Sequence, residues 1–65
     1  YSPIDYHLRL RIRKATVLME QTSLNFSEIS RLVGFNDTNY FTRQFKRVHG
    51  ISPRTYRELN PHKKH

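Results

Sequence analysis

Residues 25–50 read NFSEISRLVGFNDTNYFTRQFKRVHG, and this stretch decides the fold. Asn25 followed by Glu28 is typical of a capping box, in which polar side chains pair with the first free N–H groups of a helix. Gly34 favours the left-handed backbone that ends a helix, so this helix is short. We expect its apolar side chains to face the core, and these are Ile29, Leu32 and Val33.

A second helix follows at about residues 37–48. Asn36 or Asp37 can cap its start, and the pair His49-Gly50 is typical of its end. Its apolar residues recur at helical spacing, and the core is expected to hold Phe26, Phe35, Phe41, Phe45 and Val48. A short helix, a glycine turn and a second helix with an apolar inner side form the helix-turn-helix layout, in which the second helix enters the major groove of DNA.

The outer face of the second helix carries the predicted chemistry, and no acidic residue interrupts it. The first turns approach base edges most closely, so the predicted base-reading residues are Thr38, Asn39, Thr42 and Arg43. Arg can fork onto guanine, Asn can fork onto adenine, and Thr offers a hydroxyl and a methyl group. Lys46 and Arg47 are predicted to contact phosphates. Any surface helix can have a polar outer face, but the turn and the short preceding helix favour DNA recognition.

The segment before residue 25 is also predicted to be helical. Ser2-Pro3 is typical of a helix start, and we expect this helix to run to about Gln21. One apolar stripe along it contains Ile4, Leu8, Ile12, Ala15 and Met19. A second stripe on nearly the opposite side contains Tyr6, Leu10 and Val17. Two interpretations of the second stripe remain open, namely tolerated surface residues or a helix that bridges to a second subdomain.

A last short helix is predicted to begin at Ser52-Pro53. Tyr56 and Leu59 are expected to close the base of the core, after which Asn60-Pro61 stops the helix. A basic tail then covers residues 60–65. We find no internal repeat, and the whole pattern predicts an all-α fold of the homeodomain-like kind.

Charge and composition narrow the classes of function. The 65 residues include 12 Lys and Arg against 5 Asp and Glu, a net charge of +7, so a polyanion is the natural partner. The chain has no cysteine, no apolar run long enough to cross a bilayer and no signal peptide, so we expect a soluble cytoplasmic protein. It opens without Met, from which we expect it to be part of something larger.

Catalysis is not predicted. The histidines are scattered without metal-ligand spacing, and the carboxylates suit helix starts and solvated faces, so the sequence predicts neither an enzyme nor a metal or cofactor. A basic amphipathic helix on a membrane surface is the main rival class, because apolar and basic residues alternate over residues 8–14. Its apolar residues split into two stripes, however, and the cations follow them round the helix. RNA binding is a third class, but no exposed aromatics on a sheet are expected.

A set of residues across the chain resembles the AraC/XylS-type transcription regulators. The closing signature is carried by Ile29-Ser30, Gly34-Phe35, Asn39-Tyr40-Phe41, Arg43, Phe45-Lys46, Gly50, Ser52-Pro53 and Tyr56-Arg57. The upstream part is carried by Ser2-Pro3, Tyr6, Arg11-Ile12, Ala15 and Leu18-Met19. Two departures from the family pattern are mild: Ser30 stands where Ala is usual, and Ile12 where Leu is usual. Ser30 can hydrogen-bond back along its helix, which bears on the close helix contact expected there.

The resemblance implies an organisation and some further contacts. Residues 1–22 would form the end of a first helix-turn-helix and a linker helix, and residues 23–59 a second helix-turn-helix with its closing helix. The two motifs would read successive major-groove segments of double-stranded DNA, and an effector or dimerisation domain would lie elsewhere in the full chain. Further phosphate contacts are implied near helix starts, at Asn25, Ser27, Ser52 and Arg54. For Ser27 and Ser52, purely local capping is an equal alternative.

Overall fold

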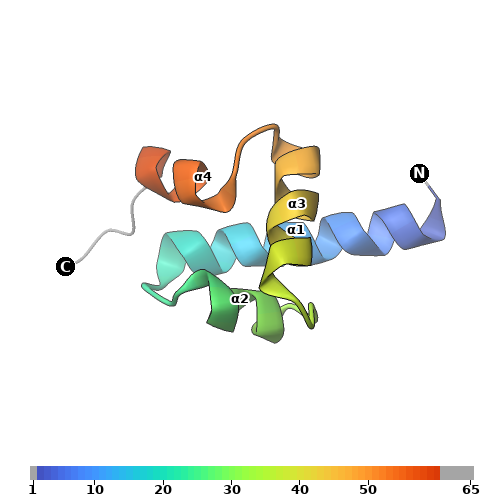
Figure 1. Cartoon of the computed structure of the whole chain (residues 1–65), viewed down its shortest axis with the longest axis horizontal. Helices are drawn as coiled ribbons and strands as arrows, with labels where there is room; N and C mark the ends of the chain where they lie inside the picture. The colour runs from blue at the N-terminus through green and yellow to red at the C-terminus, as the bar shows by residue number, and fades with distance from the viewer. Residues whose placement is uncertain (1, 61–65) are drawn as a thin grey trace.

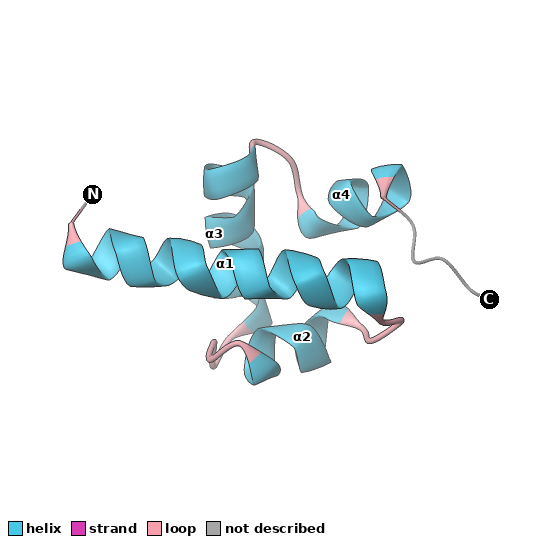
Figure 2. Ribbon diagram, turned by 180° about the vertical axis from the view of Figure 1, so that it is seen from behind, coloured by secondary structure: helices cyan, strands magenta, loops and turns pink. Residues whose placement is uncertain are grey.

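Four helices make up residues 2–60, the part of the chain that the computed structural model describes: α1 (Pro3–Gln21), α2 (Phe26–Leu32), α3 (Thr38–His49) and α4 (Pro53–Leu59). The long helix α1 runs through the middle, and α3 crosses it (Figure 1). Seen from behind, α1 lies in front, with α2 along one of its sides and α4 along the other (Figure 2). The described residues contain no strand, so the all-α prediction is confirmed.

Each helix begins where a polar side chain caps it. The Asn25 Oδ1 atom accepts a hydrogen bond from the Glu28 N–H at 2.9 Å, and the Asn25 amide donates to Glu28 Oε1 at 3.1 Å. Glu28 thus pairs with the capping side chain, not with the capping backbone N–H as in a standard capping box. Asp37, not Asn36, caps α3, since its Oδ1 atom accepts from the Asn39 N–H at 2.9 Å.

The turn between α2 and α3 is closed by backbone hydrogen bonds. Gly34 has a φ of 97°, the left-handed conformation that side chains disfavour. The Phe35 N–H donates to the Ser30 carbonyl at 2.8 Å and the Gly34 N–H to the Arg31 carbonyl at 3.1 Å, the two bonds of a Schellman ending. Phe35 is thereby turned into the core, where it is 4% exposed.

The core joins α1, α2, α3 and the turn. Its buried apolar residues are Ile12, Ala15, Met19, Ile29, Val33, Phe35, Phe41 and Phe45. The predicted stripe on α1 is therefore confirmed in its middle and C-terminal part. The prediction was wrong for Ile4, the first residue of that stripe, because its side chain is 83% exposed. The first turn of α1 extends past the crossing with α3 (Figure 1), and the Ile4 side chain in this turn is left on the surface.

Two other inward predictions were wrong for a common reason. Leu32 is 65% exposed and Leu59 is 69% exposed. In α2 the inward direction lies between Ile29, Ser30 and Val33, and Leu32 projects about 100° away from it. In α4 the inward positions are taken by Pro53, Tyr56 and Arg57. In a seven-residue helix a small rotation decides which residues are buried, and tertiary packing sets that rotation.

Aromatic rings complete the core on the side of α4. The Tyr56 ring lies 5.5 Å from the rings of both Phe45 and His49, measured between centroids. Phe26 was predicted to lie in the core but is only partly buried. The Arg57 guanidinium covers its ring, 4.9 Å from the ring centroid. Tyr40 is 42% exposed and its ring lies 5.8 Å from that of Phe35, so it packs at the rim of the core.

The chain contains a short repeat, so the prediction of no internal repeat was wrong. The pattern Ser-Pro-x-x-Tyr occurs at residues 2–6 and again at residues 52–56. Both copies start a helix in the same way: each serine caps with extended backbone, each proline follows it, and each hydroxyl accepts the N–H three residues later at 3.1 Å. The start of α1 is therefore locally equivalent to the start of α4.

Candidate nucleic-acid interface

The outer face of α3 is open to solvent. Asn39, Arg43 and Lys46 project from the side of the helix opposite the buried Phe41 and Phe45, and all three are exposed. Within residues 2–60, no hydrogen bond or ion pair engages the side chains of these three residues. The row thus offers an amide, a guanidinium and an ammonium group to a ligand.

The two predicted threonines lie beside that row, toward α2. Thr38 and Thr42 are half-buried, and the Thr42 hydroxyl donates to the Thr38 carbonyl at 2.9 Å. The Thr38 hydroxyl lies 3.3 Å from the buried Ser30 hydroxyl, which also donates to the Ser27 carbonyl at 2.9 Å. The bond of Ser30 back along its own helix is therefore present, and the contact between α2 and α3 is polar at this point.

Arg47 is held against the start of α1. Its Nη2 atom donates to Asp5 Oδ1 at 2.8 Å, and its Nε–H donates to Gln44 Oε1 at 2.9 Å. The second oxygen of Asp5 accepts from Arg9 at 3.2 Å. The hydrogen bonds from Arg47 and then Arg9 lower the pKa of the Asp5 carboxyl below its ordinary value. Arg47, a predicted phosphate contact, is therefore already engaged by an intramolecular carboxylate.

Asp5 lies near this face but was not among the predicted site residues. Its carboxylate bridges Arg9 of α1 and Arg47 of α3. The spacing of four between Asp5 and Arg9 is a helical ion-pair signal that could have suggested half of this cluster. Nothing in the sequence indicates the other half, because Asp5 and Arg47 are 42 positions apart.

The four remaining predicted phosphate residues fall into two kinds. Asn25 and Ser52 are committed to capping: both ends of the Asn25 amide pair with Glu28, and the Ser52 hydroxyl pairs with Thr55 at 3.0 Å. Ser27 and Arg54 are exposed, and no hydrogen bond within the described range involves their side chains. Asn25 and Ser52 are therefore used in local capping, whereas Ser27 and Arg54 are open surface groups.

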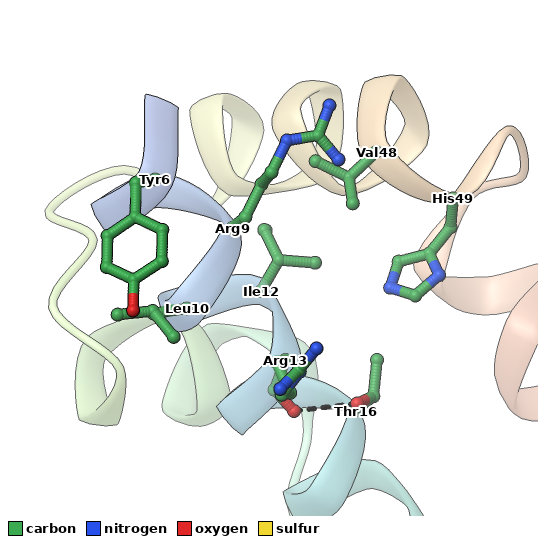
Figure 3. Close-up of a pocket in the computed structure, with 8 residues that line it drawn as sticks. All are labelled: Tyr6, Arg9, Leu10, Ile12, Arg13, Thr16, Val48 and His49. Carbon is green, nitrogen blue, oxygen red and sulfur yellow. Dashed lines mark hydrogen bonds between the residues drawn. The ribbon is translucent and has the colours of Figure 1, made fainter. Parts of the chain in front are cut away.

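A shallow hollow of about 410 Å³ lies between α1 and the C-terminal end of α3 (Figure 3). Its lining residues are Tyr6, Arg9, Leu10, Ile12, Arg13, Thr16, Val48 and His49. Partial burial lowers the pKa of the His49 imidazole. None of the predicted DNA-contacting residues lines the hollow, whereas Tyr6 and Leu10 of the second apolar stripe do.

None of the helices in residues 2–60 is long and apolar enough to span a membrane. The same residues contain no cluster of three or more histidine, aspartate or glutamate side chains that could hold a metal ion.

A short helix, a tight turn and a second helix with an open polar outer face define a helix-turn-helix DNA-binding domain. Residues 1–59 match a family described as a helix-turn-helix domain. The chain is 37% identical over 60 residues to the transcriptional regulator GbdR of Pseudomonas aeruginosa, covering 92% of this chain and 16% of GbdR. It is 43% identical over 54 residues to the transcriptional activator RhaR of Cronobacter sakazakii, covering 83% of this chain and 19% of RhaR.

A solved structure agrees with these relationships. The C-terminal domain of the two-component response regulator yesN from Fusobacterium nucleatum superimposes with a TM-score of 0.85 at 42% identity, covering 88% of this chain and 55% of that one. The chain belongs to the AraC-type helix-turn-helix domain family, and the family resemblance inferred from the sequence is confirmed. It spans about a fifth of the length of curated relatives such as RhaR, where the share is 19%.

Proposed function

We propose that the chain recognises duplex DNA as part of a bacterial transcription regulator, with α3 lying in the major groove. Thr38, Asn39, Thr42 and Arg43 meet base edges, and Lys46 and Arg47 meet phosphates. The observation that carries the proposal is the exposed row of Asn39, Arg43 and Lys46, whose donors no described residue uses. Buried rings fix the helix behind this row, so the donors stand on a rigid support.

The helix starts beside α3 supply further phosphate contacts in this proposal. Ser27 and Arg54 contribute directly, because their side chains are exposed and not engaged within residues 2–60. Asn25 and Ser52 contribute through the helix starts that they cap, where free N–H groups suit an anion. Loss of either capping side chain is expected to weaken its helix by about 1 kcal/mol whether or not DNA is bound.

We also propose that residues 1–22 belong to the end of a first helix-turn-helix and to the helix that links it to residues 23–59. The Ser-Pro-x-x-Tyr repeat supports this organisation, since Tyr56 follows α3 and packs on Phe45 and His49. Tyr6 occupies the equivalent position in the first copy and is 53% exposed, with its ring 5.8 Å from that of His7. Tyr6 then packs on the recognition helix of a preceding motif, as Tyr56 packs on α3.

The other parts of the regulator follow from the same organisation. The curated relatives are several times longer than this chain, which leaves room for an effector or dimerisation domain. We place the proposed regulator in the cytoplasm, where bacterial DNA lies, and assign it no catalytic role.

The proposal is tested by fluorescence anisotropy with labelled duplexes over a range of salt concentrations. One duplex is enriched by the protein from a randomised library, and the other is its scrambled version. We expect saturable binding that weakens steeply with salt and favours the enriched duplex. Equal binding of both duplexes would leave a basic chain without sequence recognition and would refute the proposal.

Anionic vesicles serve as the parallel target, because a basic amphipathic helix on a membrane surface is the rival class. Residues 8–14 of α1 suggested that class, but Ile12 among them is buried in the protein core and the open row on α3 is polar, so the fold favours DNA. Vesicle binding that exceeds duplex binding and orders the chain would support the membrane alternative.

A further inference from the structure

The carboxylate of Asp5 joins two helices at the edge of the proposed DNA-binding face. It lies on the first turns of α1 and accepts hydrogen bonds from Arg9 of the same helix and from Arg47 of α3. The Asp5 side chain is 23% exposed and that of Arg47 is 50% exposed, so solvent and ligands still reach the pair. This is the one ion pair between different helices among the described residues.

The Arg47 guanidinium is fixed at two points. Its Nε–H is held by Gln44 at 2.9 Å and its Nη2 by Asp5 at 2.8 Å. A guanidinium carries five N–H donors in a rigid plane, so these bonds leave the Nη1 donors unused. Arg43 and Lys46, by contrast, have no such anchor and can reorient toward any nearby phosphate.

We propose that Asp5 is a specificity-determining residue for the proposed DNA recognition: it tethers Arg47 in one position, so that this cation contacts phosphate only when the duplex is docked in one register. The proposal rests on the proposed function. A mobile cation stabilises complexes with any sequence, because it follows whichever phosphate is near and releases its counterion. A tethered cation contributes only where the docked duplex presents a phosphate to its unused edge.

The negative charge of Asp5 also disfavours non-specific binding. A carboxylate beside the docked duplex repels phosphates, and in non-specific complexes this repulsion is opposed by no fixed contact. Removing Asp5 therefore has two consequences, the loss of a like charge and the release of Arg47. Both favour non-specific binding more than specific binding.

The test compares Asp5→Asn with Glu58→Gln in the 65-residue chain. Each variant removes one negative charge, but Glu58 is exposed on α4 and makes no ion pair within the described range. The cap of α1 is kept in Asp5→Asn, because Ser2 accepts from the Asp5 backbone N–H. Circular dichroism verifies that the helical content of each variant matches that of the original chain.

We expect Asp5→Asn to raise the affinity for the scrambled duplex about threefold to tenfold and to steepen the salt dependence by about one phosphate. The affinity for the enriched duplex should rise less, so that the ratio of the two falls. Glu58→Gln should leave this ratio unchanged. Arg47→Gln added to Asp5→Asn should remove the part of the gain that comes from the released cation, because that cation is then absent, and should leave only the part that comes from the lost negative charge.

A second variant tests the tether without altering Asp5. Arg47→Lys keeps the charge but cannot hold Gln44 and Asp5 at once with a planar edge, so it should also lower the ratio. If the original chain selects the enriched duplex but Asp5→Asn and Arg47→Lys both leave the ratio unchanged, the role given to Asp5 is wrong while the proposed function stands. If the original chain does not distinguish the duplexes, the proposed function itself fails.

Discussion

Arg43 and Lys46 are neighbours on the outer face of α3 but are given different roles. Arg43→Ala should relax sequence preference at one base pair, at a cost of about 1–3 kcal/mol on the preferred duplex, because a forked contact to a base edge is lost. Lys46→Ala should weaken binding to every sequence alike and reduce the salt slope by about one phosphate. Anisotropy titrations against duplexes substituted at single positions measure both. Parallel losses on all sequences for both variants would contradict the assignment of Arg43 to a base.

The contrast between Arg43 and Arg47 indicates what sequence can predict at this scale. Helical projection from Phe41 and Phe45 is enough to find the exposed row, because the period of a helix is local. The state of Arg47 could not be predicted, since its partner Asp5 is 42 residues away and is brought near only by the crossing of α1 and α3. Local periodicity thus identifies which residues face outward, whereas tertiary contacts decide which of them are already engaged.

Ser30 offers a test of the packing beneath the row. It is 2% exposed at the contact of α2 with α3. Ser30→Ala should change the free energy of unfolding by less than about 1 kcal/mol, because the lost hydroxyl bonds mainly to its own helix. Ser30→Val should cost about 1–3 kcal/mol, because it adds methyl groups to a buried position at the contact of α2 with α3. Urea titrations compare the two, and equal costs would show that volume is not what limits this position.

At the scale of elements, α4 is joined to the end of α1 by one side-chain hydrogen bond. The Tyr56 hydroxyl donates to Glu20 Oε2 at 2.6 Å, and this bond raises the pKa of Tyr56 from 10.0 to about 12. Because the folded-state pKa is the higher one, the stabilisation is complete below about pH 10 and is lost as the pH rises to about 12. Tyr56→Phe should flatten the fall in unfolding free energy between these pH values.

Urea titrations at pH 9 and pH 12 on the original chain and on Tyr56→Phe measure this difference. The tyrosines at other positions are common to both proteins, so they cancel in the comparison. At neutral pH we expect the substitution to cost about 0.5–1 kcal/mol, the range of a single partly exposed hydrogen bond. An identical pH dependence in the two proteins would mean that the bond to Glu20 does not stabilise the fold.

The elements themselves were more predictable than their orientation. Helix starts at Ser2, Asn25 and Ser52 were found because capping depends on residues within one turn. The exposure of Leu32 and Leu59 was not foreseen, because the rotation of a short helix is set by what it packs against. Ser30 and Arg57 occupy the inward positions instead, and neither is a residue that hydrophobic patterning would select.

For the whole molecule, the length and stiffness of α1 constrain how a regulator containing it can bind. Its 19 residues correspond to about 28 Å at 1.5 Å per residue. It has no internal proline or glycine, so it is expected to act as a rigid spacer. One turn of duplex DNA measures about 34 Å, a comparable distance. A helix of this kind suits two reading elements that enter successive major-groove segments on one face of the DNA.

This constraint yields a prediction for a longer chain in which the proposed first motif precedes residue 1. Such a chain should bind a duplex with both half-sites about 10²–10⁴ times more tightly than the 65-residue chain does. Inserting five base pairs between the half-sites should remove the gain, because the second half-site then faces the opposite side of the duplex. Inserting ten should not restore it, because a rigid α1 cannot lengthen by a further 34 Å or so. Recovery at ten base pairs would mean that α1 unfolds or bends on DNA, and that the spacing of the two motifs is set elsewhere.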